Sequence, residues 1–399
     1  MTSGPGTART PLPKGFLAGG INSGVRRYRP DLGILISEKP AIAAGVFTLN
    51  ECKAAPVLYS KALLPARDIM AIITNSGQAN AATGAEGVAR NRRMAEAAAK
   101  ALDCRTEQIL TASTGVIGVQ MEIEKIVSAT PEMAERANET AEAFALAILT
   151  TDLVPKTVTT EVALSKGRVR ITGVSKGSGM IHPNMATMLG YILTDAELRP
   201  DVAHTLLKEA TDLSFNMISV DGDSSTNDCV FLMANGASGV AIANDSDHAK
   251  FKSALGDVAM FLAKAIARDG EGATKLVEVA IASAPSLALA RKAARGITLS
   301  PLIKSAIHGE DPNWGRILAR LGAEGVPAAA LDRMTLKLQG VVVFENGAPA
   351  KFDREEARKL LKRELVNLDI DLMSGSASAT AWGCDLSKKY VEINAEYGT

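Results

Sequence analysis

Several features that would assign a chain quickly to a familiar class are scarce or missing in this sequence. Its four cysteines are widely spaced and form no CxxC pair, which argues against a zinc site and against a disulfide framework. No apolar run approaches the ~20 residues that a membrane span needs, and residues 1–14 lack the apolar stretch of a secretion signal. No GxGxxG follows a strand and no GxxxxGK[ST] occurs, so a nucleotide-binding fold has little support. We therefore expect a cytoplasmic protein without a metal or nucleotide cofactor.

Charge of one sign is also missing. The 44 lysines and arginines balance 44 acidic residues, so no long-range field draws the chain to nucleic acid or to an anionic membrane. With 47% hydrophobic and 22% charged residues, the composition is that of a globular protein. The 399 residues suffice for one large core or for two to three ordinary domains.

Helical and strand patterns are mixed along the whole chain, without a regular βαβ series. Helical periodicity predicts helices at 85–102, 131–149, 200–214, 247–268 and 354–365. Strand patterns, several of them alternating as in half-buried antiparallel strands, are found at 69–74, 168–174, 229–234, 334–344 and 389–394. A second lobe is expected to begin after Lys275, which divides the chain into a main domain, 1–275, and a smaller one, 276–399.

The most unusual segment is KGSGMIHPNMATMLGYILTD, residues 176–195. Its glycine-rich first half allows tight backbone turns. Its apolar second half begins at Thr187 and predicts a buried strand. The small residue Ala186 directly precedes this threonine, so a turn there could aim the Thr187 hydroxyl at the Ala186 carbonyl.

Such a turn would favour self-cleavage of the chain. An N-to-O acyl shift at Thr187 followed by hydrolysis would leave a new N-terminal threonine. Its α-amine, with a reference pKa of about 7.7–8.0, could serve as general base to its own hydroxyl. One residue would then supply nucleophile and base, in keeping with a chain of only four histidines. Spacing alone leaves a second interpretation open, in which Thr187 merely begins a core strand.

The segment 176–189 closely resembles the self-cleavage site of the ornithine acetyltransferase (glutamate N-acetyltransferase) family of arginine biosynthesis. Further blocks resemble the same family in order, over nearly the whole chain. They are GFLAGG (15–20), GVFT (45–48), NSGQAN (75–80), STGVIG (113–118), TTD (150–152), SVDGDSSTND (219–228), DGEG (269–272), DPNWGR (311–316) and EINAEYGT (392–399).

The resemblance implies a role for each matching residue. Thr187 would carry the acetyl group as an ester after cleavage of the Ala186–Thr187 bond, and Thr114 and Gly115 would form the oxyanion hole. The residues implied in holding the amino-acid substrate are Lys176, Glu271, Asn394, Thr399, Thr187 and a threonine of the pair Thr150 and Thr151.

The resemblance also implies an architecture and a reaction. The fold would be α/β, with two β layers between helices and a smaller C-terminal α/β lobe. Fragments 1–186 and 187–399 would assemble as an α2β2 heterotetramer. The reaction would move acetyl from N2-acetylornithine to glutamate without a cofactor. Some members also accept acetyl-CoA as donor, and the sequence leaves this open here.

Two other functions remain as alternatives. An amidohydrolase or aminopeptidase with the same N-terminal nucleophile would let water replace glutamate, and an uncut binding protein would use no nucleophile at all. Asp221 and Asp223 suggest a calcium loop, but Thr226 stands where its glycine belongs, so a hydrogen-bonded turn is the better interpretation. For His182, a structural role is preferred to a catalytic one.

Overall fold

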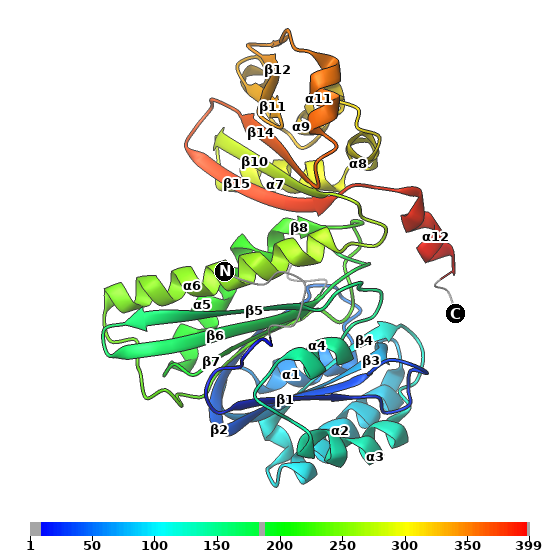
Figure 1. Cartoon of the computed structure of the whole chain (residues 1–399), viewed down its shortest axis with the longest axis vertical. Helices are drawn as coiled ribbons and strands as arrows, with labels where there is room; N and C mark the ends of the chain where they lie inside the picture. Colours follow the sequence, from blue (N-terminus) through cyan, green and yellow to red (C-terminus); the bar gives the residue numbers. More distant parts are fainter. Residues whose placement is uncertain (1–8, 183–187, 397–399) are drawn as a thin grey trace. The chain divides into compact units, whose positions relative to one another are not determined.

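The computed structural model describes residues 9–182 and 188–396. Their contacts divide them into two compact units (Figure 1). The first unit comprises 9–177, 188–216 and 223–262, and the second comprises 178–182, 217–222 and 263–396. The domain boundary after Lys275 and the two fragments flanking the Ala186–Thr187 bond stay predictions.

The first unit is built on one eight-stranded sheet. Its strand order is β4-β3-β2-β9-β7-β6-β5, with β1 paired to β2. The strands are β1 (Phe16–Ile21), β2 (Leu32–Phe47), β3 (Ala66–Gln78), β4 (Ile109–Val116), β5 (Lys156–Leu164), β6 (Gly167–Lys176), β7 (Leu189–Thr194) and β9 (Cys229–Ala234). The helices are α1 (Ala55–Leu63), α2 (Gly84–Ala101), α3 (Ile123–Glu135), α4 (Glu142–Ala147), α5 (Pro200–Leu213) and the 3-10 turns η1 (Thr106–Gln108) and η2 (Phe215–Met217), while α6 (Asp245–Arg268) continues into the second unit.

Strand β2 joins two halves of this sheet. Two apolar stretches of β2 flank the exposed residues 38–40, where Pro40 cannot donate to a ladder and the register with β3 shifts. The first stretch pairs with β1 and β3, and residues 42–47 pair with β9. The two halves of one sheet can therefore face each other as two layers.

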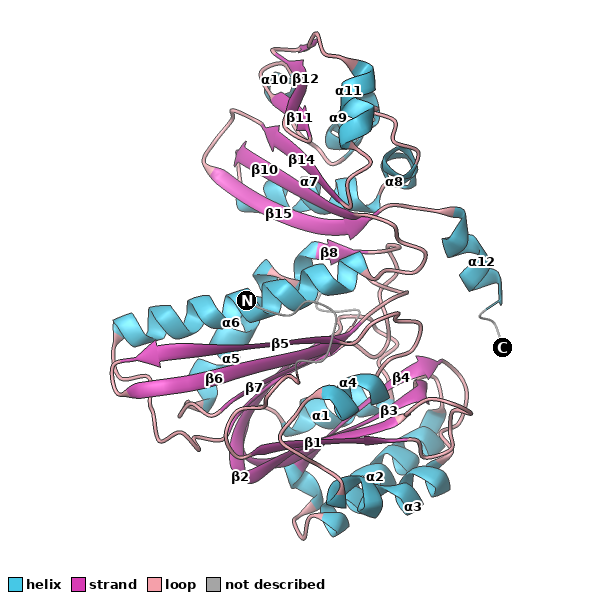
Figure 2. Ribbon diagram, viewed as in Figure 1, coloured by secondary structure: helices cyan, strands magenta, loops and turns pink. Residues whose placement is uncertain are grey.

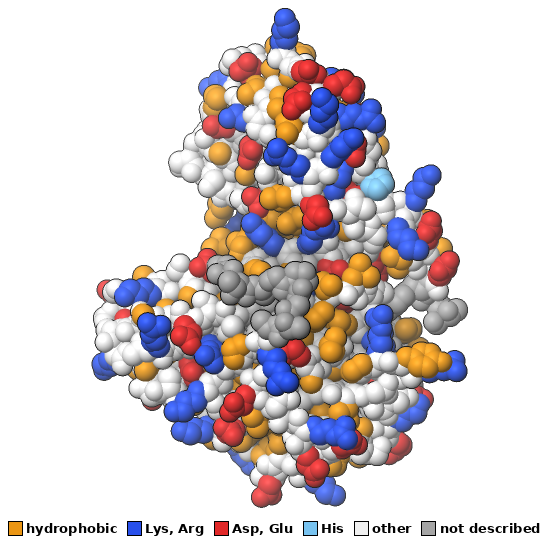
Figure 3. Space-filling view, in the orientation of Figure 1, with side chains coloured by type: hydrophobic (Ala, Val, Ile, Leu, Met, Phe, Trp, Pro, Cys, Tyr) orange, Lys and Arg blue, Asp and Glu red, His pale blue; other side chains and the backbone are white. Residues whose placement is uncertain are grey.

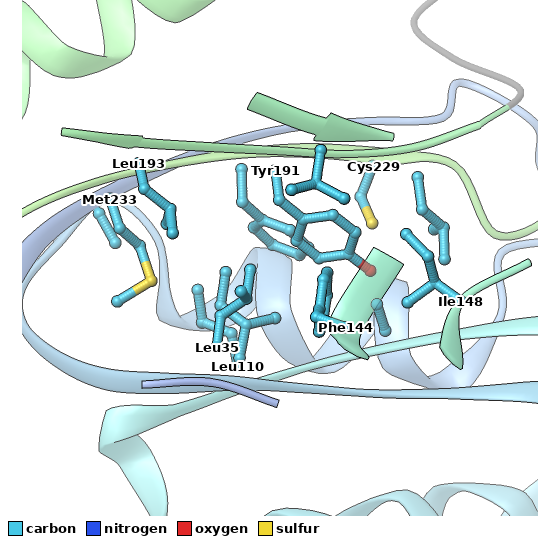
Figure 4. Packing of buried hydrophobic residues seen from close by; sticks show 14 of the residues in the cluster. Leu35, Leu110, Phe144, Ile148, Tyr191, Leu193, Cys229 and Met233 are labelled. Carbon is cyan, nitrogen blue, oxygen red and sulfur yellow. The ribbon is translucent and has the colours of Figure 1, made fainter. Parts of the chain in front are cut away.

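A shared core fills the space between these layers (Figure 4). Leu35 and Leu110 reach it from one layer, and Tyr191 and Leu193 reach it from the other. The one polar atom of Tyr191 is satisfied inside this core, because its hydroxyl lies 2.9 Å from Thr74 Oγ1. Since neighbouring strand residues point to opposite faces, the residues adjacent to these in sequence face outward.

Helices cover the outer faces of both layers (Figure 2). Ile34 and Ile73, the neighbours of inward-facing residues, pack with Met94 of α2 and Ile126 of α3. On the other layer, α6 lies against β6, where Gly173 leaves no side chain to obstruct it. The predicted arrangement, two β layers between helices, is confirmed.

The second, smaller unit is also α/β. Its seven-stranded sheet has the order β13-β12-β11-β14-β10-β15-β8, with α7 packed on β10 and β15. The strands are β8 (Ile218–Ser219), β10 (Leu276–Ala284), β11 (Thr335–Leu338), β12 (Val341–Glu345), β13 (Ala348–Pro349), β14 (Leu365–Asp371) and β15 (Ala377–Cys384). The helices are α7 (Leu287–Leu299), α8 (Pro301–His308), α9 (Trp314–Ala323), α10 (Ala328–Leu331), α11 (Arg354–Leu360) and α12 (Lys388–Glu396).

Most predicted elements are confirmed, but two are wrong. The helix predicted at 131–149 is two helices, α3 and α4, and Pro131 lies inside α3 instead of starting a helix. The strand predicted at 389–394 is helix α12, whose sequence KKYVEINAE mixes helix-favouring Lys, Glu and Ala with Tyr, Val and Ile, which gave the strand signal. In addition, the helix predicted at 354–365 ends at Leu360, and the strand at 334–344 is the pair β11 and β12. Within the described residues, no helix has both the length and the hydropathy needed to cross a membrane.

Candidate active site

The predicted cleavage segment connects two adjacent strands. In the antiparallel pair of β6 and β7, Lys176 lies opposite Leu189, so both ends of the connection are held side by side. Ala186 and Thr187 lie outside the described residues, as does Thr399.

Thr114 and Gly115 lie at the end of β4, whose parallel partner β3 ends beside it. Gly115 has a φ of +131°, and a Cβ there would lie 2.2 Å from the Gly77 carbonyl carbon, so only glycine fits. The preceding Ser113 is held by hydrogen bonds to Asn75 and from Asn227. The end of β4 is thus a fixed platform, by which we mean the anchored backbone that carries the Thr114 hydroxyl and the Gly115 N–H.

Lys176, at the end of β6, lies beside this platform. Its Nζ is 3.4 Å from Thr114 Oγ1, and only 6% of the residue is exposed. Because an ammonium group only donates, the Thr114 oxygen accepts, and its own proton remains for another oxygen atom. The structure therefore brings together a lysine and a threonine that the sequence separates by 62 residues.

A buried ion cluster that the sequence did not reveal surrounds Lys176. Asp152 Oδ1 accepts from Lys156 Nζ and from the Gly177 N–H, both at 2.7 Å. Burial opposes ionisation of Asp152, but Lys176, Lys156 and the Gly177 N–H outweigh it and hold the pKa of Asp152 below its usual value. Together, Asp152, Lys156 and Lys176 carry one net positive charge, which suits a carboxylate ligand.

The pair Thr150 and Thr151 adjoins this cluster. The Thr150 N–H donates to Asp152 Oδ2 at 3.1 Å, and the Thr150 carbonyl accepts from Arg26 at 3.4 Å. Both threonines are half-buried. Their backbone is therefore anchored. The contact of one of the two hydroxyls with a substrate stays a prediction.

Replacing Asp152 with asparagine is expected to destabilise the protein strongly. The change keeps the shape but leaves two buried ammonium groups without this carboxylate, which typically costs about 3–5 kcal/mol. The pKa of Asp152 is lower in the folded than in the unfolded protein. The ionised carboxylate therefore stabilises the wild type fully above about pH 3.9, and this stabilisation is lost as the pH falls through the pKa of Asp152 in the folded protein. Urea unfolding at pH 7 measures the loss. Asp68→Asn, which removes an exposed pair with Arg105, should cost less than about 1 kcal/mol, and an equal loss in both variants would contradict the role of the cluster.

In the second unit, the structure describes Glu271 and Asn394, two more of the residues that are predicted to hold the amino-acid substrate. Asn394 Nδ2 donates to Glu271 Oε2 at 2.8 Å, and Glu271 is only 8% exposed. The Glu271 carboxylate lies where a side chain of residue 179 would be, since a Cβ on Gly179 would come within 2.4 Å of the carboxyl carbon. A buried carboxylate of this kind can accept from a substrate ammonium group.

Asp221 holds the loop that precedes the predicted cleavage bond. Its two carboxylate oxygens accept from the N–H groups of Met180 and Ile181, at 2.6 and 2.9 Å. The Val220 N–H donates to the Ile181 carbonyl at 2.6 Å. Asp221 is therefore hydrogen-bonded to the backbone, which is consistent with the turn interpretation of this motif. Among the residues that the structure describes, no group of three or more His, Cys, Asp or Glu side chains is placed to hold a metal ion.

His182 also helps to hold the loop that precedes the predicted cleavage bond. Arg295 Nη2 lies 2.9 Å from His182 Nε2, so this nitrogen must accept, and the proton resides on Nδ1, 3.3 Å from Ser219 Oγ. Ser219 in turn donates to the Ile181 carbonyl at 3.3 Å. Burial, with a smaller effect of the Arg295 charge, lowers the pKa of His182 to about 4. The imidazole is thus a neutral link between a cation and the loop.

We expect His182 to stay neutral throughout the physiological range. Because its folded pKa lies below the unfolded value of about 6.5, the unfolded chain binds a proton first, and this site lowers stability as the pH falls from 6.5 towards 4. Proton NMR of the imidazole C2–H gives the midpoint, and His182→Gln assigns the signal. Arg295→Gln should raise the midpoint, and a wild-type midpoint near 6.5 would disprove the assignment.

Comparisons with known proteins find matches over nearly the whole chain. The ArgJ family model matches residues 17–399. The arginine biosynthesis bifunctional protein ArgJ of Thermotoga neapolitana is 46% identical over 396 residues, covering 97% of this chain and all of that protein. The chloroplastic ArgJ of rice (Oryza sativa subsp. japonica) is 45% identical over 400 residues, covering 97% of this chain and 86% of that protein. The crystal structure of ArgJ from Bacillus halodurans has a TM-score of 0.51 and 40% identity, covering 52% of this chain and 99% of the crystallised one. The chain therefore belongs to the ArgJ family.

Proposed function

We propose that the protein transfers the acetyl group of N2-acetyl-L-ornithine to L-glutamate through an acetyl ester on Thr187. Membership of the ArgJ family, whose relatives are named arginine biosynthesis bifunctional proteins, supports this reaction. The observation that carries it is the contact between buried Lys176 and the Thr114 hydroxyl. There, a positively charged site for a carboxylate adjoins a donor for a carbonyl oxygen.

The nucleophile would arise by cleavage of the bond between Ala186 and Thr187. The Thr187 hydroxyl attacks the Ala186 carbonyl, the C–N bond breaks, and water hydrolyses the ester to leave an N-terminal amine. The relative from Bacillus halodurans supports a divided chain. Its crystallised chain aligns over 99% of its length with only 52% of this chain, and fragment 187–399 would be about 53% of the 399 residues.

Acetyl transfer then takes two steps. The Thr187 α-amine accepts the hydroxyl proton as the oxygen attacks the acetyl carbonyl of acetylornithine. The amide C–N bond breaks, the proton passes to the departing nitrogen, and ornithine leaves. The amine of glutamate then attacks the ester, a C–N bond forms as the C–O bond to Thr187 breaks, and the proton that the amine loses passes to the Thr187 oxygen. In both steps, the Thr114 hydroxyl and the Gly115 N–H would stabilise the negative charge on the carbonyl oxygen.

Both amino acids carry the same α-carboxylate, which Lys176 would bind with the net positive charge that it shares with Asp152 and Lys156. Glu271, oriented by Asn394, would accept from an ammonium group. Thr150, Thr151 and Thr399 complete the proposed set of substrate contacts. No step in this scheme needs a metal or a nucleotide cofactor.

Three finer points belong to the same proposal. The relatives are named bifunctional, and we include acetyl-CoA as a second donor that would acetylate the same threonine. We place the protein in the cytoplasm. We also expect two copies of each fragment to assemble as an α2β2 heterotetramer.

A hydrolase or aminopeptidase is the rival function, because water could attack the same ester. Incubation with acetylornithine, with and without glutamate, separates the two. We expect ornithine release and acetylglutamate formation to be equal and to need glutamate. Release of acetate at the full rate without glutamate would replace the proposed function with hydrolysis.

Asp221→Asn is expected to slow the cleavage about tenfold or more. The amide keeps one acceptor oxygen but turns an NH2 group towards a backbone N–H, so one of two bonds to the carboxylate is lost. The disappearance of the full-length band after synthesis in a cell-free system measures the rate. Asp257→Asn, at an exposed residue of α6, is the control. Cleavage of Asp221→Asn at the wild-type rate would contradict a positioning role.

A further inference from the structure

A basic hollow in the second unit lies outside the catalytic scheme. It has a volume of about 430 Å³, within the range of sites for small molecules. Helices α7 and α9 provide most of its lining, and His182 lies at one side. The six side chains that matter for its chemistry are His182, Arg291, Lys292, Arg295, Arg320 and Glu324.

The charge of this hollow is strongly one-sided. Arg291, Lys292 and Arg295 of α7 and Arg320 of α9 supply four positive charges, and Glu324 supplies one negative charge. His182 adds none near pH 7, because its pKa is about 4. The lining therefore carries three net positive charges, in a protein whose charges sum to zero over the whole sequence and whose visible face mixes both signs (Figure 3).

The single carboxylate is already bound from two sides. Glu324 Oε1 pairs with Arg320 Nη2 at 2.5 Å, and Glu324 Oε2 lies 3.7 Å from Lys292 Nζ, which also donates to the backbone carbonyl of Glu324 at 3.0 Å. Gly296 makes this approach possible, since a Cβ there would lie 2.4 Å from Glu324 Oε1. The carboxylate thus ties α9 to α7 and fixes two of the four cations in place.

Two guanidinium groups keep donors for a ligand. Among the described residues, Arg291 has no ion-pair partner, and the ion pair of Arg320 with Glu324 uses Nη2, which leaves the Nη1 group of this partly exposed side chain for a ligand. Guanidinium groups present planar pairs of N–H donors that match the oxygens of a phosphoryl group. Three net positive charges fit an anion of two or more negative charges better than a single carboxylate.

We propose that this hollow is a binding site for a phosphate-bearing anion, held by the guanidinium groups of Arg291 and Arg320. The site is additional to the acetyl-transfer site and does not depend on it. The same chemistry would accept inorganic phosphate or the phosphate groups of a larger ester such as coenzyme A.

Calorimetric titration of the purified full protein at low salt, with inorganic phosphate and separately with coenzyme A, tests the proposal. We expect saturable binding of at least one of them, weakened by added sodium chloride. Arg291→Gln and Arg320→Gln should each weaken it about tenfold or more, whereas Lys351→Gln, exposed in the same unit, should not. Thermal melting checks that each variant remains folded.

The outcomes separate the two ligand sources and the two proposals. Tighter binding of coenzyme A than of phosphate would identify a phosphate ester as the ligand, and equal binding would identify the free anion. Thr187→Ala should bind as well as the wild type, even if acetyl transfer proves to be the wrong function. Absence of binding by both probes at millimolar concentration, or equal affinity in Arg291→Gln and Lys351→Gln, would overturn the proposal.

Discussion

A chain with alanine in place of Thr187 is expected to remain a single polypeptide of 41.7 kDa and to transfer no acetyl group. The substitution removes the hydroxyl that would attack the Ala186 carbonyl, so no N-terminal amine forms. It also removes the oxygen that would carry the acetyl ester. Loss of a nucleophile with its general base typically lowers kcat by roughly 10⁴–10⁶. A denaturing gel, mass spectrometry and an acetylornithine–glutamate assay measure both effects.

Two further variants make this result specific. Thr187→Ser keeps a hydroxyl and should still cut, but slowly. Thr205→Ala removes a threonine from α5, and it should be cut and active like the wild type. An intact bond between residues 186 and 187 in fully active wild-type protein would refute the mechanism, and an active Thr187→Ala chain would do the same.

Local patterns predicted much of the fold. The period of apolar residues gave α2, α5 and α6 to within two residues at each end, and β9 to the residue. These elements bury one clear face or lie wholly in the core, so sequence and burial agree. The bend in β2 is also visible locally, as an interruption of apolar sequence by a glutamate, a lysine and a proline.

The two wrong elements failed because a local signal was outweighed. Pro131 usually starts or breaks a helix, yet Ile126 and Met133 on either side of it pack into one cluster against β1 and β2. That burial holds α3 continuous through the proline. At 389–394 the error was the reverse, because alternating residues indicated a strand although α12 buries none of its side chains.

Part of the candidate site could be predicted from the sequence, and part of it could not. The family resemblance predicted that Thr114 and Lys176 belong to one site, and in the structure their side chains lie 3.4 Å apart. Lys156 gave no signal, because one lysine at the start of a strand is usually a surface group. The link between His182 and Arg295 spans 113 residues of sequence, and only folding brings the two side chains together. Contacts of that range follow from topology and not from local pattern.

Thr114→Ala is expected to lower kcat about 100–1000-fold while changing KM much less. The hydroxyl would donate to the carbonyl oxygen mainly when that oxygen becomes negative, so its loss raises the barrier more than it weakens substrate binding. Lys176 Nζ, 3.4 Å away, gives the Thr114 hydroxyl one partner and so orients the proton elsewhere. Steady-state kinetics with acetylornithine and glutamate on completely cleaved protein measure the change.

Two substitutions distinguish a donor from a packing residue at this position. Thr114→Val keeps the size of threonine but cannot donate, so it should be as slow as alanine, whereas Thr114→Ser should recover most of the rate. Cleavage offers a second, independent readout, because the Ala186 carbonyl also becomes negative when Thr187 attacks it. If the same hydroxyl serves both reactions, Thr114→Val should slow processing and turnover together. A valine variant with the wild-type kcat would leave the Gly115 N–H, fixed by its close approach to Gly77, as the only donor of this pair.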